Sequence, residues 1–287
     1  MFVSTKVSIS AELPNLPKRF LPKSHLPTLI WRKNLVDCFA GRAFVVNLHP
    51  VKQSNNLSPI MELTPIAHFH SPFASKFGIP KQSGLVKTLE GQIVFTPEFR
   101  NADFIRGIDQ FDYLWLLWEF SANPHSATSP LVRPPRLGGN QRVGVFASRS
   151  PFRPNPIGLS CVKLNSVEWN TPKGPVLHIG GADLMNLTPI FDIKPYITYA
   201  DSLPEARSGF VDSNPCRLLQ VDIPEPLAAL LTPNHLEALR QTLAQDPRPH
   251  YQTNPDKIYG MPFCNMDVRF RVNGEVLHVV EMIPLNK

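Results

Sequence analysis

The stretch YLWLLWEF, residues 113–120, is the longest run of apolar and aromatic side chains in this sequence of 287 residues. It falls far short of the roughly 18 apolar residues that a membrane-spanning helix needs, and its length suits a buried β-strand. Hydrophobic residues make up 43% of the chain and charged residues 18%, which is typical of a soluble protein with a sizeable core. The stretch therefore predicts a buried β-strand and not a membrane-spanning helix.

Runs with similar strand character surround this stretch, separated by segments that contain proline and glycine. We expect strands at residues 64–70, 92–96, 113–119, 142–147, 158–167, 176–182, 192–196, 267–272 and 275–283. Strands at such short spacing are typical of an antiparallel barrel or sandwich. The fold class predicted for the chain is mainly β, with an antiparallel β-barrel as its main domain.

Two helices and a hairpin turn complete the expected elements. A short helix at residues 101–111 leads into the 113–119 strand. A longer one is expected at 233–244, where Pro233 suits the first turn and a leucine recurs at helical spacing. Asn273 and Gly274 predict a tight β-hairpin turn. Because periodicity is lost near residues 200–215, we expect a barrel domain at 61–205 and a small α+β C-terminal domain at 206–287.

The basic character of the chain comes from its N-terminal segment. Of 29 basic and 23 acidic residues, eight and two lie in residues 1–60, so the net charge of +6 arises there and 21 of each sign remain in 61–287. The segment is rich in proline and poor in periodicity. We expect it to be a disordered basic extension; a start codon placed too far upstream, before Met61, and an organellar transit peptide are the two explanations left open.

Positive charge is nevertheless concentrated in one part of the main body. No aspartate or glutamate lies between Glu119 and Glu168, whereas six basic residues do: Arg133, Arg136, Arg142, Arg149, Arg153 and Lys163. Such a block indicates an anionic partner, and a solvated basic loop is the alternative. Prolines in the stretch SRSPFRPNPIG favour a fixed geometry for its two arginines, as the binding of a carboxylate or phosphate requires.

Several familiar sites are missing from the sequence. It has neither the glycine-rich lysine loop of nucleotide-phosphate sites nor a GxGxxG motif after a strand. The four cysteines are far apart with no CxxC pair, which favours a reducing, cytoplasmic setting and argues against zinc. His68 and His70 share a strand face without a third ligand nearby, so no metal is expected. What remains are four stiff polar loops, at 79–84, 133–142, 148–158 and 181–197, which we expect to form one pocket.

These loops also carry a resemblance. The segments PRLGGNQRVGVFASRSPFRPNPIGLS (135–160) and DLMNLTPIFDIKPYI (183–197) resemble the signature of the TsaA/TrmO family, also called YaeB-like. Segments AQDPRPHY (244–251) and FCNMDVRFRV (263–272) resemble the C-terminal region of its bacterial members. The likeness covers essentially residues 61–287, and residues 1–60 have no counterpart in it.

The resemblance implies a function. It implies a homodimeric tRNA methyltransferase that uses S-adenosylmethionine, is built on a β-barrel, and methylates N6 of N6-threonylcarbamoyladenosine (t6A) at position 37, beside the anticodon, to give m6t6A. The implied partners are the tRNA anticodon loop carrying t6A and a second copy of the chain. Two alternatives stay open: a non-catalytic RNA-binding barrel, and a methyltransferase that acts on another acceptor.

The resemblance also implies a donor site. The family's Pro-Arg-Gln loop appears as Pro80-Lys81-Gln82, which keeps the positive charge but loses the guanidinium fork. Where many relatives carry a polar pair after the aromatic strand, this chain has Ser121 and Ala122. The remaining donor-site candidates are Arg149, Leu159, Asp183, Leu184, Met185 and Asn186.

Residues for the acceptor side follow from these loops and from the C-terminal QDPRPHY segment. Arg149 is a candidate partner of a carboxylate on the donor or on t6A. The other substrate-binding candidates are Arg136, Phe152, Arg153, Arg248 and Tyr251. Methyl transfer in line from the sulfonium to N6 requires loss of the N6 proton, for which Asp192 is a candidate acceptor, with a purely structural role as the alternative. Asn155 and Lys194 are candidates for orienting the substrate.

Overall fold

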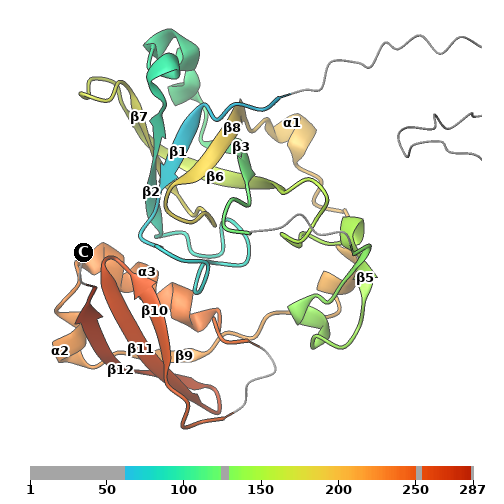
Figure 1. The fold of residues 1–287 in the computed structure, drawn as a ribbon, viewed down its shortest axis with the longest axis vertical. Coiled ribbons are helices and arrows are strands. Elements are labelled where there is room, and N and C mark those ends of the chain that lie inside the picture. The colour runs from blue at the N-terminus through green and yellow to red at the C-terminus, as the bar shows by residue number, and fades with distance from the viewer. Residues whose placement is uncertain (1–61, 124–128, 250–253, 286–287) are drawn as a thin grey trace, which may run out of the picture. The chain divides into compact units, whose positions relative to one another are not determined.

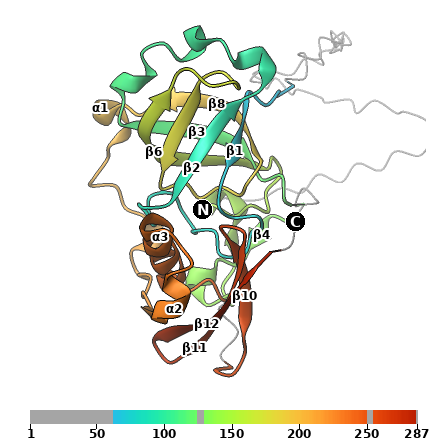
Figure 2. The ribbon, with the colours of Figure 1, turned by 90° about the vertical axis from the view of Figure 1, so that its left-hand side faces the viewer.

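The computed structural model describes residues 62–123, 129–249 and 254–285, all of which belong to one compact unit beginning at residue 59. The expected N-terminal extension, residues 1–60, lies outside the described residues. Figures 1 and 2 show the described elements from two directions.

Six antiparallel strands form a closed barrel, which confirms the predicted fold class (Figures 1 and 2). In barrel order they are β1 (Ala67–His70), β2 (Glu90–Phe95), β7 (Val176–Gly180), β6 (Ile157–Glu168), β3 (Tyr113–Glu119) and β8 (Thr188–Pro195). Pairing of β1 with β8 closes the barrel, with Ala67 opposite Ile190. Closure matters because it leaves no barrel strand with an unpaired edge.

Alternation of side chains explains why the 113–119 stretch forms the wall of this barrel. Leu114, Leu116 and Trp118 point inward and are buried, whereas the residues between them are partly exposed. The same alternation runs along β6, where Val162 and Leu164 contribute to the barrel core. A period of two matches the pleat of a strand, so one face of each strand packs into the core.

Two expected elements differ from the structure. The expected strand at 142–147 is only the two-residue strand β5 (Val143–Gly144), paired with β4 (Leu131–Val132), and a 3-10 turn follows at Val145–Ala147. The expected helix at 101–111 is two 3-10 turns, Ala102–Ile105 and Ile108–Gln110. Gly107, with φ of 83°, separates the two turns, because this left-handed conformation does not continue a helix.

The C-terminal part contains the predicted helix α3 (Pro233–Ala244) and the predicted hairpin of β11 (Met266–Asn273) and β12 (Val276–Pro284). Its four-stranded sheet has two further strands that the sequence patterns did not predict, β10 (Tyr259–Phe263) and β9 (Gln220–Asp222). Strand β9 runs parallel to β12, a pairing between distant segments that no local signal announces. The short helix α1 (Thr198–Asp201) follows β8 of the barrel, and α2 (Glu225–Ala228) connects β9 to α3.

The connection from β1 to β2 takes part in the C-terminal core. Phe73, Val86 and Leu89 are buried together with side chains of α3 and of the C-terminal sheet. The ring of Phe73 lies edge-on to that of Phe263, with centroids 5.3 Å apart. This packing anchors both ends of the loop that carries Pro80, Lys81 and Gln82. Among the residues that the structure describes, no helix is long and apolar enough to cross a membrane.

Candidate functional site

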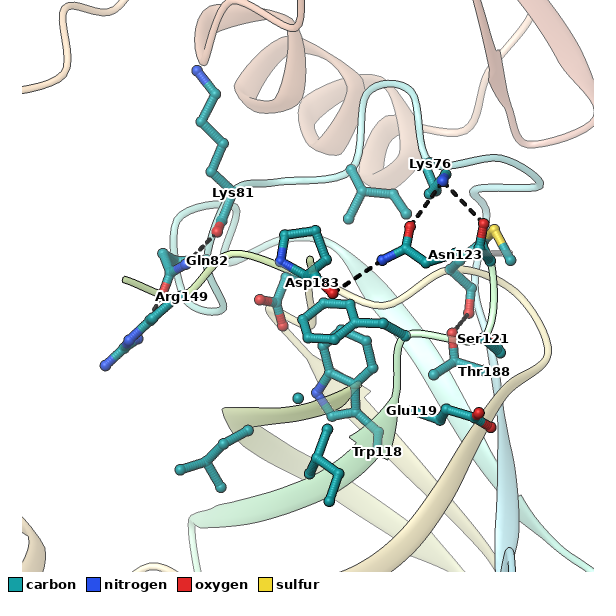
Figure 3. Close-up of a pocket in the computed structure, with 18 of the residues that line it drawn as sticks. Lys76, Lys81, Gln82, Trp118, Glu119, Ser121, Asn123, Arg149, Asp183 and Thr188 are labelled. Carbon is teal, nitrogen blue, oxygen red and sulfur yellow. Dashed lines mark hydrogen bonds between the residues drawn. The ribbon is translucent and has the colours of Figure 1, made fainter. Parts of the chain in front are cut away.

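A cavity of about 390 Å³ opens at one end of the barrel, a size usual for small-molecule sites (Figure 3). Its lining comes from segments far apart in sequence: the β1–β2 loop, the end of β3 and the residues after it, the loop before β6, the start of β6, and the β7–β8 connection. The lining residues are Lys76, Ile79, Pro80, Lys81, Gln82, Trp115, Trp118, Glu119, Phe120, Ser121, Ala122, Asn123, Ser148, Arg149, Pro151, Arg153, Ile157, Gly158, Leu159, Asp183, Met185 and Thr188.

Two glycines bring the first and last of these segments together. The Gly84 N–H donates to the Gly181 carbonyl at 2.8 Å, and the Gly181 N–H donates to the Leu89 carbonyl at 2.8 Å. Gly181 has φ of 72°, and a side chain there would meet the backbone of Gly84 at 3.5 Å. The close approach brings Gln82, two residues before Gly84, and Asp183, two residues after Gly181, to the same cavity.

Arg149 and Gln82 join two of the cavity loops. A guanidinium N–H of Arg149 donates to the side-chain oxygen of Gln82 (Figure 3). Both side chains line the cavity, and the positive charge of Arg149 acts on the Asp183 carboxylate. The arginine that the sequence placed in a stiff loop thus binds directly to the amide of Gln82 in the Pro80-Lys81-Gln82 (PKQ) segment at the edge of the cavity.

Asp183 stands at the end of a buried polar triad formed by Trp118, Ser160 and Asp183. The indole N–H of Trp118 donates to Ser160 Oγ at 2.9 Å, and the Ser160 hydroxyl donates to Asp183 Oδ1 at 2.6 Å. Removal from water raises the pKa of Asp183, and this outweighs the opposing effects of Ser160, the backbone N–H groups of Asp183 and Ser83, and Arg149.

Lys76 and Asn123 connect three segments at the rim. The Lys76 ammonium donates to the Ala122 carbonyl and to Asn123 Oδ1, both at 2.9 Å, and the Asn123 amide donates to the Pro151 carbonyl at 3.3 Å. These bonds connect the β1–β2 loop, the end of β3 and the loop before β6, as Figure 3 shows. The rim is therefore held by side chains as well as by backbone packing.

Most of the predicted donor-site residues meet at this cavity. Nine of the eleven line it: Pro80, Lys81, Gln82, Ser121, Ala122, Arg149, Leu159, Asp183 and Met185. Leu184 does not, because it points into the barrel core, where it is 1% exposed. Asn186 does not line it either: its side-chain oxygen accepts from the Ser71 N–H at 3.2 Å, and its N–H donates to the Phe73 carbonyl at 2.9 Å.

The three catalytic candidates do not line the cavity. Asp192 is paired with Lys194 on the same strand, with an Nζ–Oδ2 distance of 2.8 Å, and its other oxygen accepts from the Ile193 N–H at 2.9 Å. Asn155 is exposed, and its carbonyl accepts from the Ile157 N–H at 2.8 Å. The Asp192–Lys194 pair lies on β8, opposite Leu117 and Trp115 of β3, and neither of its side chains lines the cavity.

The substrate-binding candidates are dispersed. Arg153 lines the cavity and donates to the carbonyls of Ser148 and Ser150 at 3.3 and 3.2 Å, which braces its own loop. Phe152, in the same loop, is 54% exposed. Arg136 lies elsewhere and donates to the Asn214 carbonyl at 3.2 Å. Tyr251 lies outside the described residues.

Arg248 forms a two-bond ion pair with Asp246, at 2.9 Å for each bond. Burial alone would raise the pKa of Asp246, but the hydrogen bonds and charge of Arg248, with a contribution from Lys81, lower it. The influence of Lys81 shows that the PKQ loop and the QDPRP segment lie within electrostatic range of each other. Arg248 itself does not line the cavity.

Two residues that support Asp183, namely Ser160 and Trp118, are not among those predicted from the sequence. Ser160 is a polar residue at an inward position of β6, between Gly158 and Val162. A polar residue in this otherwise apolar face was the sequence signal that could have identified it. Gly158 provided another: a side chain there would lie 2.3 Å from the Trp118 ring, so the glycine leaves room for that ring. Nothing local marked Trp118 as different from the other aromatic residues of its strand.

The arrangement suits a polar, partly cationic organic ligand. It combines a buried carboxylate, an arginine, an amide and several apolar surfaces, the combination typical of sites for small molecules with mixed chemistry. No group of three or more histidine, cysteine or acidic side chains able to hold a metal ion occurs in the described part of the chain.

Comparisons with known proteins identify relatives of both the barrel and the C-terminal part. The sequence model of the tRNA-methyltransferase O N-terminal domain matches residues 68–202, and that of the TrmO C-terminal domain matches residues 218–285. The chain is 40% identical over 227 residues to the tRNA (adenine(37)-N6)-methyltransferase of Escherichia coli K12, covering 76% of this chain and 96% of that protein.

Two further matches come from Pseudomonas aeruginosa. A putative S-adenosylmethionine-dependent methyltransferase, RcsF, is 38% identical over 217 residues, which cover 72% of this chain and 91% of that protein. The crystal structure of TrmO from this organism matches with a TM-score of 0.62 at 30% identity, covering 77% of this chain and 97% of that one. Both halves of the described structure thus have counterparts in the same proteins, and the chain belongs to the tRNA-methyltransferase O (TrmO) family.

Proposed function

We propose that this protein uses S-adenosylmethionine to methylate N6 of adenosine 37 in tRNA, with t6A as the acceptor and m6t6A as the product. The observation that carries the proposal is the convergence of Gln82, Arg149 and Asp183 on one cavity in a member of this family. The names of the E. coli and P. aeruginosa relatives support the reaction and the donor, respectively.

The cavity residues fit the chemistry of the donor. S-adenosylmethionine supplies an electrophilic methyl group on a sulfonium, and it carries an ammonium, a carboxylate, a ribose diol and an adenine. Asp183 complements the cationic groups or the diol, Arg149 complements a carboxylate, and Leu159 and Met185 offer apolar contact to the adenine. A cavity of about 390 Å³ is within the size range of sites for molecules of this kind.

The residues of this chain contribute mainly by alignment. Holding two reactants in a near-attack geometry supplies about 7–11 kcal/mol in favourable cases. The loop contacts Arg149–Gln82 and Lys76–Asn123 hold the walls of the cavity in place before the acceptor arrives. The carboxylates that line the cavity are Glu119 and Asp183, so the proposal assigns no proton transfer to Asp192.

Binding of tRNA uses the positive block and its aromatic neighbour. In this proposal, Arg153 and Arg136 contact phosphates from separate loops, the exposed ring of Phe152 stacks on an unpaired base of the anticodon loop, and Arg248 and Tyr251 help to form the acceptor pocket. Residues 206–287 would then belong to the acceptor site, and residues 61–205 would hold the donor.

A second copy of the chain completes the proposed assembly. Support comes from the resemblance and from the exposed apolar side chains that follow β8, where Tyr199 is 91% and Leu203 is 73% exposed. A second copy of the chain could cover these exposed side chains. Light scattering coupled to size exclusion is expected to give a mass of about twice 32.2 kDa.

The first test is methyl transfer by the full chain from labelled S-adenosylmethionine to two otherwise identical tRNAs, one with t6A37 and one with unmodified A37. Label in the t6A sample alone is expected. Label in both samples would contradict the acceptor while leaving the donor in place.

Donor binding, measured by calorimetry on the same preparation, separates the remaining alternative. Binding of S-adenosylmethionine without label transfer to either tRNA would contradict the proposed reaction. Absence of both binding and transfer would favour the RNA-binding barrel.

A further inference from the structure

The buried polar triad of Trp118, Ser160 and Asp183 has a fixed direction. An indole nitrogen is a donor only, so the bond from Trp118 uses Ser160 Oγ as an acceptor. The Ser160 hydroxyl proton is then directed to Asp183 Oδ1, 2.6 Å away. A short O–H···O contact to a carboxylate is among the stronger hydrogen bonds in proteins.

The triad does not lead a proton out of the site. Trp118 has no acceptor atom and does not release its N–H proton in the ordinary pH range, so a proton that reached Asp183 would have no exit along this path. Ser160 is 1% exposed, and Trp118 is 7% exposed, which also excludes solvent from the path. What remains is orientation of the carboxylate and stabilisation of its charged form.

The location of Asp183 makes that stabilisation necessary. Its carboxyl group lines the cavity but is largely removed from water, which favours the neutral acid. Four groups oppose this: the Ser160 hydroxyl, the backbone N–H groups of Asp183 and Ser83, and the charge of Arg149. Ser160 is the largest of these, and it is the one supplied by a side chain dedicated to Asp183.

We infer that Ser160 is a positioning residue that keeps Asp183 charged and turned toward a cationic methyl donor, and so sets the pH range over which the donor binds. The inference rests on the proposed function, because it takes the ligand to be S-adenosylmethionine. It adds a residue outside the cavity lining whose effect passes through Asp183. Charged neighbours at the cavity are Arg149, Lys81, Lys76, Arg153 and Glu119, and no histidine lines it.

The sign of the effect follows from the hydrogen bond. Only the ionised carboxylate attracts a cation, so donor affinity falls as the pH falls through the pKa of Asp183 in the free protein. Ser160→Ala removes a donor to the charged form and raises that pKa further, so the fall begins at a higher pH. The ratio of the variant's Kd to the wild-type Kd must therefore grow as the solution becomes more acidic.

The test is calorimetric titration of the full-length protein with S-adenosylmethionine at several values between pH 5.5 and 7.5. The donor's own α-amino group, with a pKa of about 8, begins to titrate at the alkaline end, but it does so equally for both proteins and cancels in the ratio of their Kd values. For Ser160→Ala we expect a Kd about tenfold higher than wild type at the acid end and a smaller ratio at the alkaline end. Asp183→Asn should bind weakly and with little dependence on pH.

Matched variants separate positioning from packing. Ser160→Thr retains the hydroxyl and should restore the wild-type pH profile. Ser160→Cys replaces it by a weak donor of similar size and should behave like Ser160→Ala, which covers the case that the alanine variant does not fold. Thr242→Val also removes a buried hydroxyl, one that has no hydrogen-bond partner in the described structure and does not line the cavity, and should leave donor binding unchanged.

A ratio of Kd values that stays constant across the pH range would overturn the inference, as would equal Kd values for Ser160→Ala and wild type. Failure of the wild-type protein to bind S-adenosylmethionine at any pH would instead overturn the proposed function, and the inference with it.

Discussion

The two buried cores of this protein treat polar groups differently. In the barrel core, Ser160 is almost fully buried, and both of its hydrogen-bonding partners are in place. In the C-terminal core, the hydroxyls of Thr242 and Tyr259 are buried without a hydrogen-bond partner in the described structure. Large apolar side chains otherwise fill both cores.

The C-terminal core serves mainly to stabilise the fold, whereas the end of the barrel core is arranged around a ligand cavity. The C-terminal core packs α3 against a sheet, and its polar atoms are tolerated because the surrounding packing outweighs their cost. The barrel core ends at a cavity, where a carboxylate that is costly to bury accepts from the Ser160 hydroxyl of β6, which in turn accepts from Trp118 of β3. Changes in the C-terminal core should therefore alter stability, and changes at the barrel end should alter ligand binding and activity.

The largest expected effect is on the stability of the C-terminal core. Phe270 is fully buried and stacks against Tyr259 and Phe77, with centroids 5.6 and 6.5 Å apart. Phe270→Ala should lower the free energy of unfolding by about 3–5 kcal/mol, through lost burial and the cavity left behind. Denaturant unfolding measures this, with Phe146→Ala, at a site that is 80% exposed, as the control. A loss as small as that of the control would mean that this core contributes little stability.

The next effect concerns the barrel end and appears in activity. Arg149→Ala removes the contact with Gln82 and a charge at the cavity, and should lower kcat/KM for methyl transfer by about ten- to a hundredfold with little change in melting temperature. Arg106→Ala is the matched control, because it deletes an arginine whose ion pair with Asp103 is largely exposed. Unchanged kcat/KM in Arg149→Ala would remove this residue from the proposed site.

A smaller effect comes from the Asp246–Arg248 pair and depends on pH. The pKa of Asp246 is lowered in the folded protein, so its stabilisation is present above the unfolded pKa and is lost as the pH falls through the folded value. Asp246→Asn should cost roughly 1–2 kcal/mol at pH 7, and the difference should shrink below about pH 4. Thermal unfolding against pH tests this, with the exposed Asp256→Asn as the control; a difference that persists at low pH would contradict the charge-based explanation.

The smallest effect contrasts the two cores directly. Tyr259→Phe removes a hydroxyl without a partner and should change the free energy of unfolding by less than about 1 kcal/mol, in the stabilising direction if at all. Trp118→Phe removes an N–H that has a partner and leaves Ser160 without its donor, which should cost about 1 kcal/mol or more. Equal losses in the two variants would mean that partnered and unpartnered polar groups do not distinguish the cores.

The predicted elements that proved accurate have local causes. Residues 113–119 alternate with a period of two, α3 begins at Pro233 and repeats leucine at helical spacing, and Asn273-Gly274 turns a hairpin. The elements that were wrong or missing have different causes: the expected helix at 101–111 is interrupted at Gly107, β5 extends over only two residues, and β9 forms by pairing with the distant strand β12. A three-residue strand has too little pattern of its own to be recognised.

The candidate site likewise contains residues that could be identified from the sequence and residues that could not. Arg149 and the PKQ segment were identified from charge, proline content and resemblance, and they meet at the cavity. Ser160 was not identified, because its role requires Asp183 and Trp118 to lie beside it, 23 and 42 residues away in sequence. Asp192 is a candidate because of its chemistry, but strand pairing places it opposite Leu117 on β3, and it does not line the cavity.

The sequence by itself determined the class of fold, the main strands, helix α3, the stiff basic loop and the family resemblance, because periodicity, turn chemistry and motif spacing act over a few residues. Tertiary structure decided which loops share a cavity and which carboxylate lies there. Barrel closure through β1 and β8 and the approach of Gly84 to Gly181 bring those groups together. Hydrogen bonds such as those of Arg149 and Ser160 form only between segments that the closed barrel has already made neighbours.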